Sequence, residues 1–273
     1  MTQTYTEPAS KLLELGMPEN PWLDYASLGI AHDHIPELLR LLQDDALRWM
    51  VPPDDLPDDE DLTEWYAQVH AWRALAQLKA EEAILPIIGL LHQIDEMDDD
   101  WLSSDVDKIF TLLGPASIQP LGEYLLDEQN QMYARAEAAT GLTSLGKARP
   151  ETRDACVSYL VSALEKYEEN DEGLNGFLIH DLVGLKAVEH VDLIGDAFAA
   201  EAVDEFIMGD FEDVQVELGL LKERTTPRRL LVPKFLPDMD TSPRASKPRK
   251  LEKKTKSKRK QEKKSRKKNR KRK

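Results

Sequence analysis

The stretch Leu78–Leu91, LKAEEAILPIIGLL, recurs along this chain of 273 residues and decides its fold. Shifted by 34 positions, it overlies Leu112–Leu125, LLGPASIQPLGEYL. A third copy lies within Arg135–Leu164, and a fourth, Leu185–Phe198, repeats the Leu-Lys-Ala of the first. Ser27–Leu42 reads as an earlier, divergent copy. Repetition at such a period predicts an array of similar supersecondary units.

Each copy reads as two helices joined by a short turn. After the turn, apolar side chains fall at i, i+3, i+4 and i+7, which places them on one helix face: Ile84, Ile87, Ile88 and Leu91. Pro86 lies in the first turn of this helix, where a missing N–H is tolerated. One hairpin cannot bury its apolar face, but stacked hairpins bury a continuous core. The sequence therefore predicts an all-α fold, a right-handed α-solenoid.

These blocks resemble the HEAT-like helical repeat, including the version found in phycobilin lyases. Residues 21–220 are similar to an uncharacterised bacterial HEAT-like family, a domain of unknown function. The likeness lies in the blocks WLDYASLGIAHDHIPELLRLL, VHAWRALAQLKAEEAILPIIGLL, LNGFLIHDLVGLKAVEH and VDEFIMGDFEDVQVELGL. The resemblance implies a fold and brings no activity and no catalytic residues. Some relatives end in a Cys-rich zinc motif like that of the SecA translocase, and this chain carries a basic tail there instead.

Charge is divided unevenly along the chain. Residues 247–273 hold 18 Lys and Arg and 2 Glu, so residues 1–246 hold the other 18 basic and 49 acidic side chains. The two parts carry net charges of +16 and −31. We therefore predict three regions: a helical repeat domain over residues 8–221, a Pro-containing linker over 222–246, and a disordered polybasic tail over 247–273.

The tail is the candidate nucleic-acid-binding segment, since clustered cations bind polyanions through release of counterions. It has no aromatic side chain for base stacking, so binding to RNA, DNA or a ribosome should be independent of sequence. Binding to an acidic protein or to the chain's own acidic body, binding to anionic lipid, and a role in solubility alone remain alternatives. The candidate residues are Lys253, Lys254, Lys256, Lys258, Arg259, Lys260, Lys263, Lys264, Arg266, Lys267, Lys268, Arg270, Lys271, Arg272 and Lys273.

Acidic runs fall between consecutive repeats, at residues 54–61, 95–100 and 168–172. They read either as solvated loops or as a docking strip for a basic partner. Tryptophans at the starts of repeats are candidate anchors, because aromatic residues dominate binding hot spots, although burial in the core is the alternative. The predicted partner-binding residues are Trp65, Trp101, Asp98, Asp99 and Asp100.

The other residues that could be catalytic or bind a metal are better explained by structural roles. Cys156, the one cysteine, lies on an apolar stretch and is expected to be a buried small hydrophobe. His32 and His34 precede Pro36 and are expected to serve a turn and a helix start. The six histidines lack metal-binding spacing, and no P-loop, GxSxG or GxGxxG occurs. We therefore expect no metal, no cofactor and no catalytic residue.

These features together predict a non-enzymatic scaffold or adaptor in the cytoplasm. Its repeats would bind a protein partner, and its tail would tether the complex to nucleic acid or ribosomes. The alternative is a lyase- or chaperone-like accessory protein, by analogy with phycobilin lyases, with polar groups converging near His70, Arg73, Arg135 and His180. A third interpretation is recruitment to anionic membrane surfaces.

Overall fold

The computed structural model describes residues 4–48, 63–97 and 99–228. Within these ranges all regular secondary structure is helical, and no β-strand occurs. The chain divides into two units, residues 1–229 and 230–273. The predicted tail and most of the predicted linker lie outside the described residues. The all-α prediction is confirmed.

The helices follow one another in the order that the repeated sequence blocks predict. Their bounds are α1 (Ile35–Leu42), α2 (Asp45–Arg48), α3 (Ala67–Gln77), α4 (Ile84–Ile88), α5 (His92–Met97), α6 (Asp100–Leu113), α7 (Ile118–Leu126), α8 (Met132–Ala148), α9 (Arg153–Leu164), α10 (Glu172–Gly184), α11 (Val191–Ala199), α12 (Glu205–Met208) and α13 (Phe211–Glu217). Short 3₁₀ helices lie between them: η1 (Ala9–Leu13), η2 (Tyr25–Leu28), η3 (His32–His34), η4 (Thr63–Tyr66), η5 (Glu81–Ala83), η6 (Pro115–Ser117), η7 (Pro150–Thr152) and η8 (Val188–His190).

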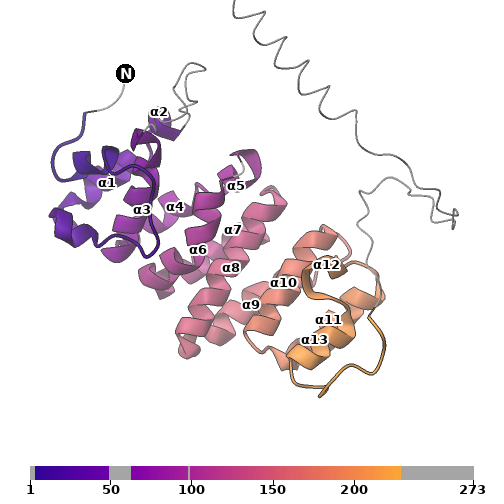
Figure 1. Cartoon of the computed structure of the whole chain (residues 1–273). Coiled ribbons are helices and arrows are strands. Elements are labelled where there is room, and N and C mark those ends of the chain that lie inside the picture. The colour runs from indigo at the N-terminus through magenta and orange to yellow at the C-terminus, as the bar shows by residue number, and fades with distance from the viewer. Residues whose placement is uncertain (1–3, 49–62, 98, 229–273) are drawn as a thin grey trace, which may run out of the picture. The chain divides into compact units, whose positions relative to one another are not determined.

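The α-helices form two layers, and successive repeats add one helix to each. In the first layer α1 packs on α3, α3 on α6, α6 on α8, and α8 on α10. In the second layer α4 packs on α7, α7 on α9, and α9 on α11. The layers meet where α7 and α9 contact α8, so helices stack in chain order from indigo to orange (Figure 1). Each repeat thus buries its apolar face against its neighbour, as in HEAT-like repeats.

The repeated Leu-Lys-Ala tripeptide ends α3 and α10 in the same way. Lys79 and Lys186 adopt left-handed backbone conformations, with φ of 55° and 54°. The N–H of Ala80 then donates to the carbonyl of Leu75 at 3.1 Å, and the corresponding bond after α10 is 3.0 Å. These bonds form a Schellman motif, which satisfies carbonyls that the end of a helix leaves unpaired. The tripeptide is therefore a helix stop.

Several residue-level predictions are confirmed. Cys156 is completely buried in α9. His32 and His34 form η3, directly before α1. Two further side chains also have structural roles: Asp210 caps α13 by accepting the N–H of Asp213 at 3.1 Å, and Trp72 lies in the core, at 2% exposure.

Three carboxylates of the acidic runs at residues 95–100 and 168–172 bind helix N-termini. Asp99 and Asp171 are the N-caps of α6 and α10. Asp95 accepts the N–H groups of Tyr133 and Ala134, at 3.1 and 2.7 Å, at the start of α8. Such bonds satisfy donors that helix N-termini leave open and oppose the positive end of the helix dipole. The run at residues 54–61 lies outside the described residues.

Replacing Lys79 with glycine should stabilise the protein. A side chain in the left-handed region costs about 1 kcal/mol, which glycine avoids, although glycine also gains freedom in the unfolded chain. We expect Lys79→Gly to raise the free energy of unfolding by about 0.5 kcal/mol in urea titrations. Lys79→Ala keeps the Cβ and serves as the control, and a Gly variant no more stable than the Ala variant would contradict this account.

Candidate functional site

Four of the five predicted partner-binding residues line one hollow, which we call the Trp65–Trp101 hollow. Trp65 belongs to η4, and Asp99, Asp100 and Trp101 lie at the start of α6. They border a cavity of about 300 Å³. The fifth residue, Asp98, lies outside the described residues. The fold therefore brings together residues that are more than thirty positions apart in the sequence.

Four aromatic side chains line this hollow: Trp65, Tyr66, Trp72 and Trp101. Trp65 is 44% exposed at its mouth, and the buried Trp72 lies deeper. Tyr66 meets Trp101 edge to face, with ring centroids 5.8 Å apart and an angle of 80° between the rings. Such a pair contributes about 0.5–1.5 kcal/mol beyond burial alone, so these rings hold each other in place. Exposed Met97 completes the wall with a polarisable thioether.

The charge of the hollow is negative. Asp99 accepts the N–H of Leu102 at 3.0 Å through its Oδ1. Burial raises the pKa of Asp99, and its bonds to backbone N–H groups act in the opposite direction. Asp100 is exposed to solvent. Among the described residues that line the hollow, none is Lys or Arg.

Behind the hollow, α6 buries the carboxylate of Asp105. Arg73 of α3 donates to it through Nε at 2.6 Å and through Nη2 at 3.0 Å. The indole N–H groups of Trp72 and Trp22 donate at 2.9 and 3.1 Å. Arg73 also donates through Nη1 to the carbonyl of Glu19 at 3.0 Å. This network joins α3, α6 and the N-terminal segment, and it orients Trp72 in the wall of the hollow.

The same guanidinium lies against two tryptophan rings. Its Cζ is 5.1 Å from the centroid of Trp22 and 5.9 Å from that of Trp101. Cation–π attraction at these distances contributes about 0.5–2 kcal/mol when water is excluded. Trp101 is thus held by Arg73 and Tyr66 together, and Trp22 is a buried structural residue.

Asp105→Asn should destabilise the protein by about 3 kcal/mol, because it leaves the buried Arg73 charge without its partner. Chemical unfolding of purified protein measures the loss. The matched control is Asp107→Asn, at an exposed position on the same helix, where a change within about 0.5 kcal/mol is expected. Equal effects of the two substitutions would show that the network does not hold the N-terminal repeats together.

A second hollow lies further along the first layer, and we call it the Tyr133–Phe177 hollow. Its volume is about 550 Å³. Tyr133 is 52% exposed and meets Phe177 with ring centroids 6.3 Å apart. Asp171, Glu172 and Asp204 also line it, and again no Lys or Arg does among the described residues. The sequence analysis did not single out Tyr133. Tyr133 is the second residue of α8, as Trp101 is the second residue of α6, and this likeness becomes visible only once the bounds of the two helices are known.

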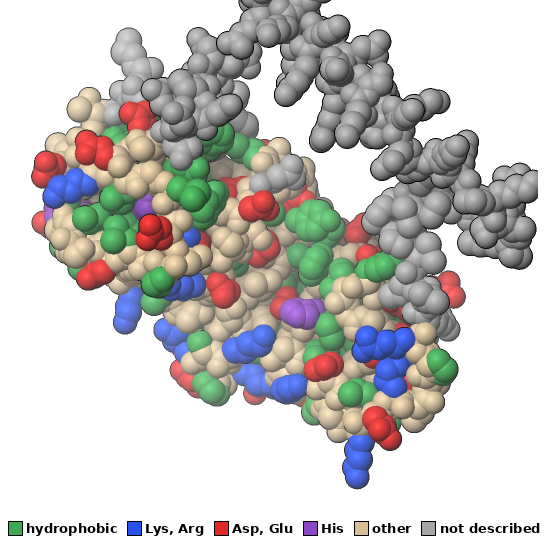
Figure 2. All heavy atoms as spheres, viewed as in Figure 1, with side chains coloured by type: hydrophobic (Ala, Val, Ile, Leu, Met, Phe, Trp, Pro, Cys, Tyr) green, Lys and Arg blue, Asp and Glu red, His purple; other side chains and the backbone are tan. Residues whose placement is uncertain are grey.

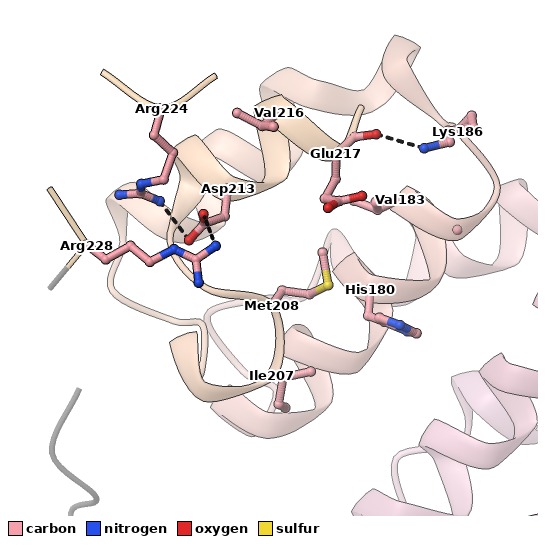
Figure 3. Close-up of a pocket in the computed structure, with 11 residues that line it drawn as sticks. His180, Val183, Lys186, Ile207, Met208, Asp213, Val216, Glu217, Arg224 and Arg228 are labelled. Carbon is pink, nitrogen blue, oxygen red and sulfur yellow. Dashed lines mark hydrogen bonds and ion pairs between the residues drawn. The ribbon is translucent and has the colours of Figure 1, made fainter. Parts of the chain in front are cut away.

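A third pocket, of about 480 Å³, lies at the C-terminal end of the repeats and has a different character (Figure 3). Arg224 pairs with Asp213 at 2.7 Å, and Arg228 reaches the same carboxylate at 3.0 Å. The ammonium of Lys186 donates to the carbonyl of Glu217 at 2.7 Å. Figure 3 shows these polar groups across the pocket from Met208 and Ile207. Its three cations are thus engaged within the chain, and residues 224–228, predicted as linker, contact α13.

Glu137 of α8 is a partly buried carboxyl between neighbouring helices. Its Oε1 accepts the hydroxyl of Ser103 at 2.5 Å. Burial raises the pKa of Glu137 to about 7, and the charges of Asp181 and Asp107 act in the same direction. The folded protein therefore holds a proton that the unfolded chain releases at lower pH. Stability conferred by this group is present at pH 4.5 and is lost as the pH rises toward 7.

Glu137→Gln should abolish that pH dependence. Glutamine keeps an acceptor for Ser103 and carries no charge, so we expect it to be more stable than the native protein by about 1–3 kcal/mol at pH 8 and equal to it near pH 4.5. Urea unfolding at both pH values measures this difference. Glu151→Gln, at an exposed position, should show no such pattern, and a Glu137→Gln variant without a pH-dependent gain would contradict the assignment.

The four polar residues that a lyase-like pocket would need are placed apart. His70 is buried between the hydroxyl of Tyr25, at 2.7 Å, and the carbonyl of Gly16, at 2.9 Å. Arg73 is committed to Asp105, and Arg135 donates to the carbonyl of Leu125 at 2.8 Å. His180 lines the C-terminal pocket without the other three.

In the described ranges, no group of three or more His, Cys, Asp or Glu side chains could hold a metal ion. No helix in the same ranges combines the length and the apolar composition needed to cross a membrane. Figure 2 shows acidic and basic side chains interspersed with apolar patches over the face in view.

The stacked hairpins and the hollows at their edge define an all-helical protein of the HEAT-like repeat class. Comparison with known families matches residues 27–234 to the family described as "Protein of unknown function (DUF1186)". The chain belongs to this family, which confirms the predicted resemblance. No curated protein and no solved structure matches the chain.

Proposed function

We propose that this protein is a non-enzymatic cytoplasmic adaptor. Its helical repeats hold a protein partner, and residues 247–273 tether the complex to nucleic acid or ribosomes. The observation that carries the proposal is the Trp65–Trp101 hollow, where the exposed Trp65 and the half-buried Trp101 lie on neighbouring helical elements. Tryptophan and tyrosine in such positions supply much of the binding energy at protein interfaces.

The tail supports the second half of the proposal through its charge. Eighteen cations in residues 247–273 would release many counterions on binding a polyanion, so affinity should fall steeply with salt. The repeat domain is acidic and would be repelled by phosphates. This difference in charge assigns a separate role to each part. The repeats bind the protein partner specifically, and the tail binds the polyanion independently of its sequence.

The contacts of His70, Arg73 and Arg135 argue against the lyase-like alternative. That alternative needs polar groups converging on a ligand, whereas these side chains are buried and bonded to other parts of the fold. An anionic membrane surface remains an alternative target for the tail, since each Lys or Arg near such a surface contributes about 1 kcal/mol.

Truncation after residue 246 should separate RNA binding by the tail from partner binding by the repeats. We expect full-length protein to bind a fluorescent 20-nucleotide RNA of mixed sequence, with affinity falling at least about 100-fold between 50 and 200 mM salt. The 1–246 variant should lose this binding but retain a salt-resistant protein partner in nuclease-treated pull-downs. Fluorescence anisotropy and mass spectrometry measure the two properties.

The control variant for the pull-down is Trp65→Ala in the full-length chain. It should bind RNA normally and lose the protein partner. RNA binding that survives removal of residues 247–273 would overturn the tether. Retention of every partner by Trp65→Ala would overturn the proposed partner surface. Vesicles of anionic lipid that bind full-length protein in place of RNA would identify a membrane target.

A further inference from the structure

The N-terminal ends of α6, α8 and α10 lie side by side. Asp95 and Asp99 are four positions apart, and the first binds the start of α8 while the second caps α6. Tyr133, at the start of α8, and Asp171, the cap of α10, line the same hollow. We call this surface the N-terminal edge of the first layer.

Both hollows of this layer open at the N-terminal edge, and they share one chemistry. The first combines Trp65 and Trp101 with Asp99 and Asp100. The second combines Tyr133 and Phe177 with the carboxylates Asp171, Glu172 and Asp204. In each, an edge-to-face aromatic pair stands next to aspartates that cap helices. The described lining of both lacks Lys and Arg, in contrast to the C-terminal pocket.

Aromatic faces beside carboxylates attract cations. The face of an indole or phenol ring carries negative charge density, and Lys or Arg side chains bind against it through cation–π attraction. Nearby carboxylates add Coulomb attraction and select against anions. The positive ends of α6, α8 and α10 would otherwise favour anions, but Asp99, Asp95 and Asp171 already bind their N–H groups. The preference of these hollows for a cationic ligand therefore follows both from the aromatic rings and from the aspartates that cap the helices.

The distance between the hollows sets the length of a ligand that fills both. The first hollow lies at α3 and α6, and the second lies at α8 and α10, two helix positions further along the layer. Packed helices are about 8–10 Å apart, which gives roughly 16–20 Å between the hollows. An extended chain advances about 3.3 Å per residue, so about five or six residues span this distance.

We propose that the partner's binding segment is an extended peptide with two Lys or Arg side chains about six residues apart. One cationic side chain enters the Trp65–Trp101 hollow and the other enters the Tyr133–Phe177 hollow. This inference rests on the proposed adaptor function and names the chemistry of the partner. The net charge of −31 on residues 1–246 complements such a segment.

The test uses full-length protein and fluorescent 12-residue peptides of Gly, Ser and Ala with two lysines. Peptides with lysines six residues apart should bind about tenfold more tightly than peptides with lysines two residues apart, because only the former reach both hollows. Peptides with norleucine in place of both lysines keep the apolar side-chain length and should not bind. Fluorescence anisotropy at 50 mM salt gives the Kd values.

Variants locate the binding. Trp65→Ala and Tyr133→Ala should each weaken binding of the peptide with lysines six residues apart by about 3- to 30-fold, the range expected for loss of one cation–π contact. After either substitution, the two lysine spacings should bind alike. The matched control is Leu85→Ala, which removes a side chain that is 69% exposed on α4 of the second layer, and it should leave the Kd unchanged. Thermal melting by circular dichroism verifies that the variants fold.

Three results would overturn the inference. Norleucine peptides that bind as well as lysine peptides would show an apolar ligand. Kd values that neither Trp65→Ala nor Leu85→Ala changes would show diffuse charge attraction to the acidic domain. Peptide binding that improves after removal of residues 247–273, in a manner dependent on Trp65, would show that the chain's own tail occupies the edge instead of a partner.

Failure of this inference is distinguishable from failure of the adaptor function. A protein partner that the repeats retain in pull-downs, but that the lysine peptides do not displace, would leave the adaptor function standing and refute the cationic segment. Peptide binding at the edge without any partner retained by residues 1–246 would refute the adaptor function and leave the chemistry of the edge intact.

Discussion

The buried carboxylate of Asp105 is the constraint on which the N-terminal repeats depend. A charge at 2% exposure is tolerated only when donors replace the water it has lost, and Arg73, Trp72 and Trp22 supply them. These donors come from α3 and from the segment before η2, so one carboxylate fixes three parts of the chain. The same network also fixes one wall of the Trp65–Trp101 hollow, because Trp72 bonds to Asp105 and Trp101 lies against Arg73.

Sequence reasoning recovered the fold because the fold is local and repeated. Apolar spacing after each turn, proline in the first turn of a helix and the Leu-Lys-Ala stop act within a few residues of one another. The Schellman motifs at Lys79 and Lys186 show that the repeated Leu-Lys-Ala tripeptide ends a helix at both positions. Acidic runs were harder to interpret, since a carboxylate that caps a helix and one that only faces water look the same in the sequence. Asp95 caps a helix that begins more than thirty residues later.

The candidate site was recovered in part. Trp65 and Trp101 stood out as tryptophans at the starts of repeats, and the fold brings them to one hollow. Tyr66 and Met97 complete that hollow only through tertiary packing, and the Tyr133–Phe177 hollow became recognisable only when α8 and α10 were seen side by side. Buried pairs such as Arg73 and Asp105 likewise join positions that no short-range pattern connects. Residues that share a surface in a stacked repeat are separated by whole repeats in the sequence.

The central claim is that the repeats bind their ligand through the Trp65–Trp101 hollow. The most direct test follows the indole N–H signals of ¹⁵N-labelled protein by NMR while the retained partner is added. The account predicts that the signals of Trp65 and Trp101 move in step with binding, while that of Trp22, bonded to buried Asp105, stays in place. Unmoved signals of Trp65 and Trp101 at saturating partner would contradict it.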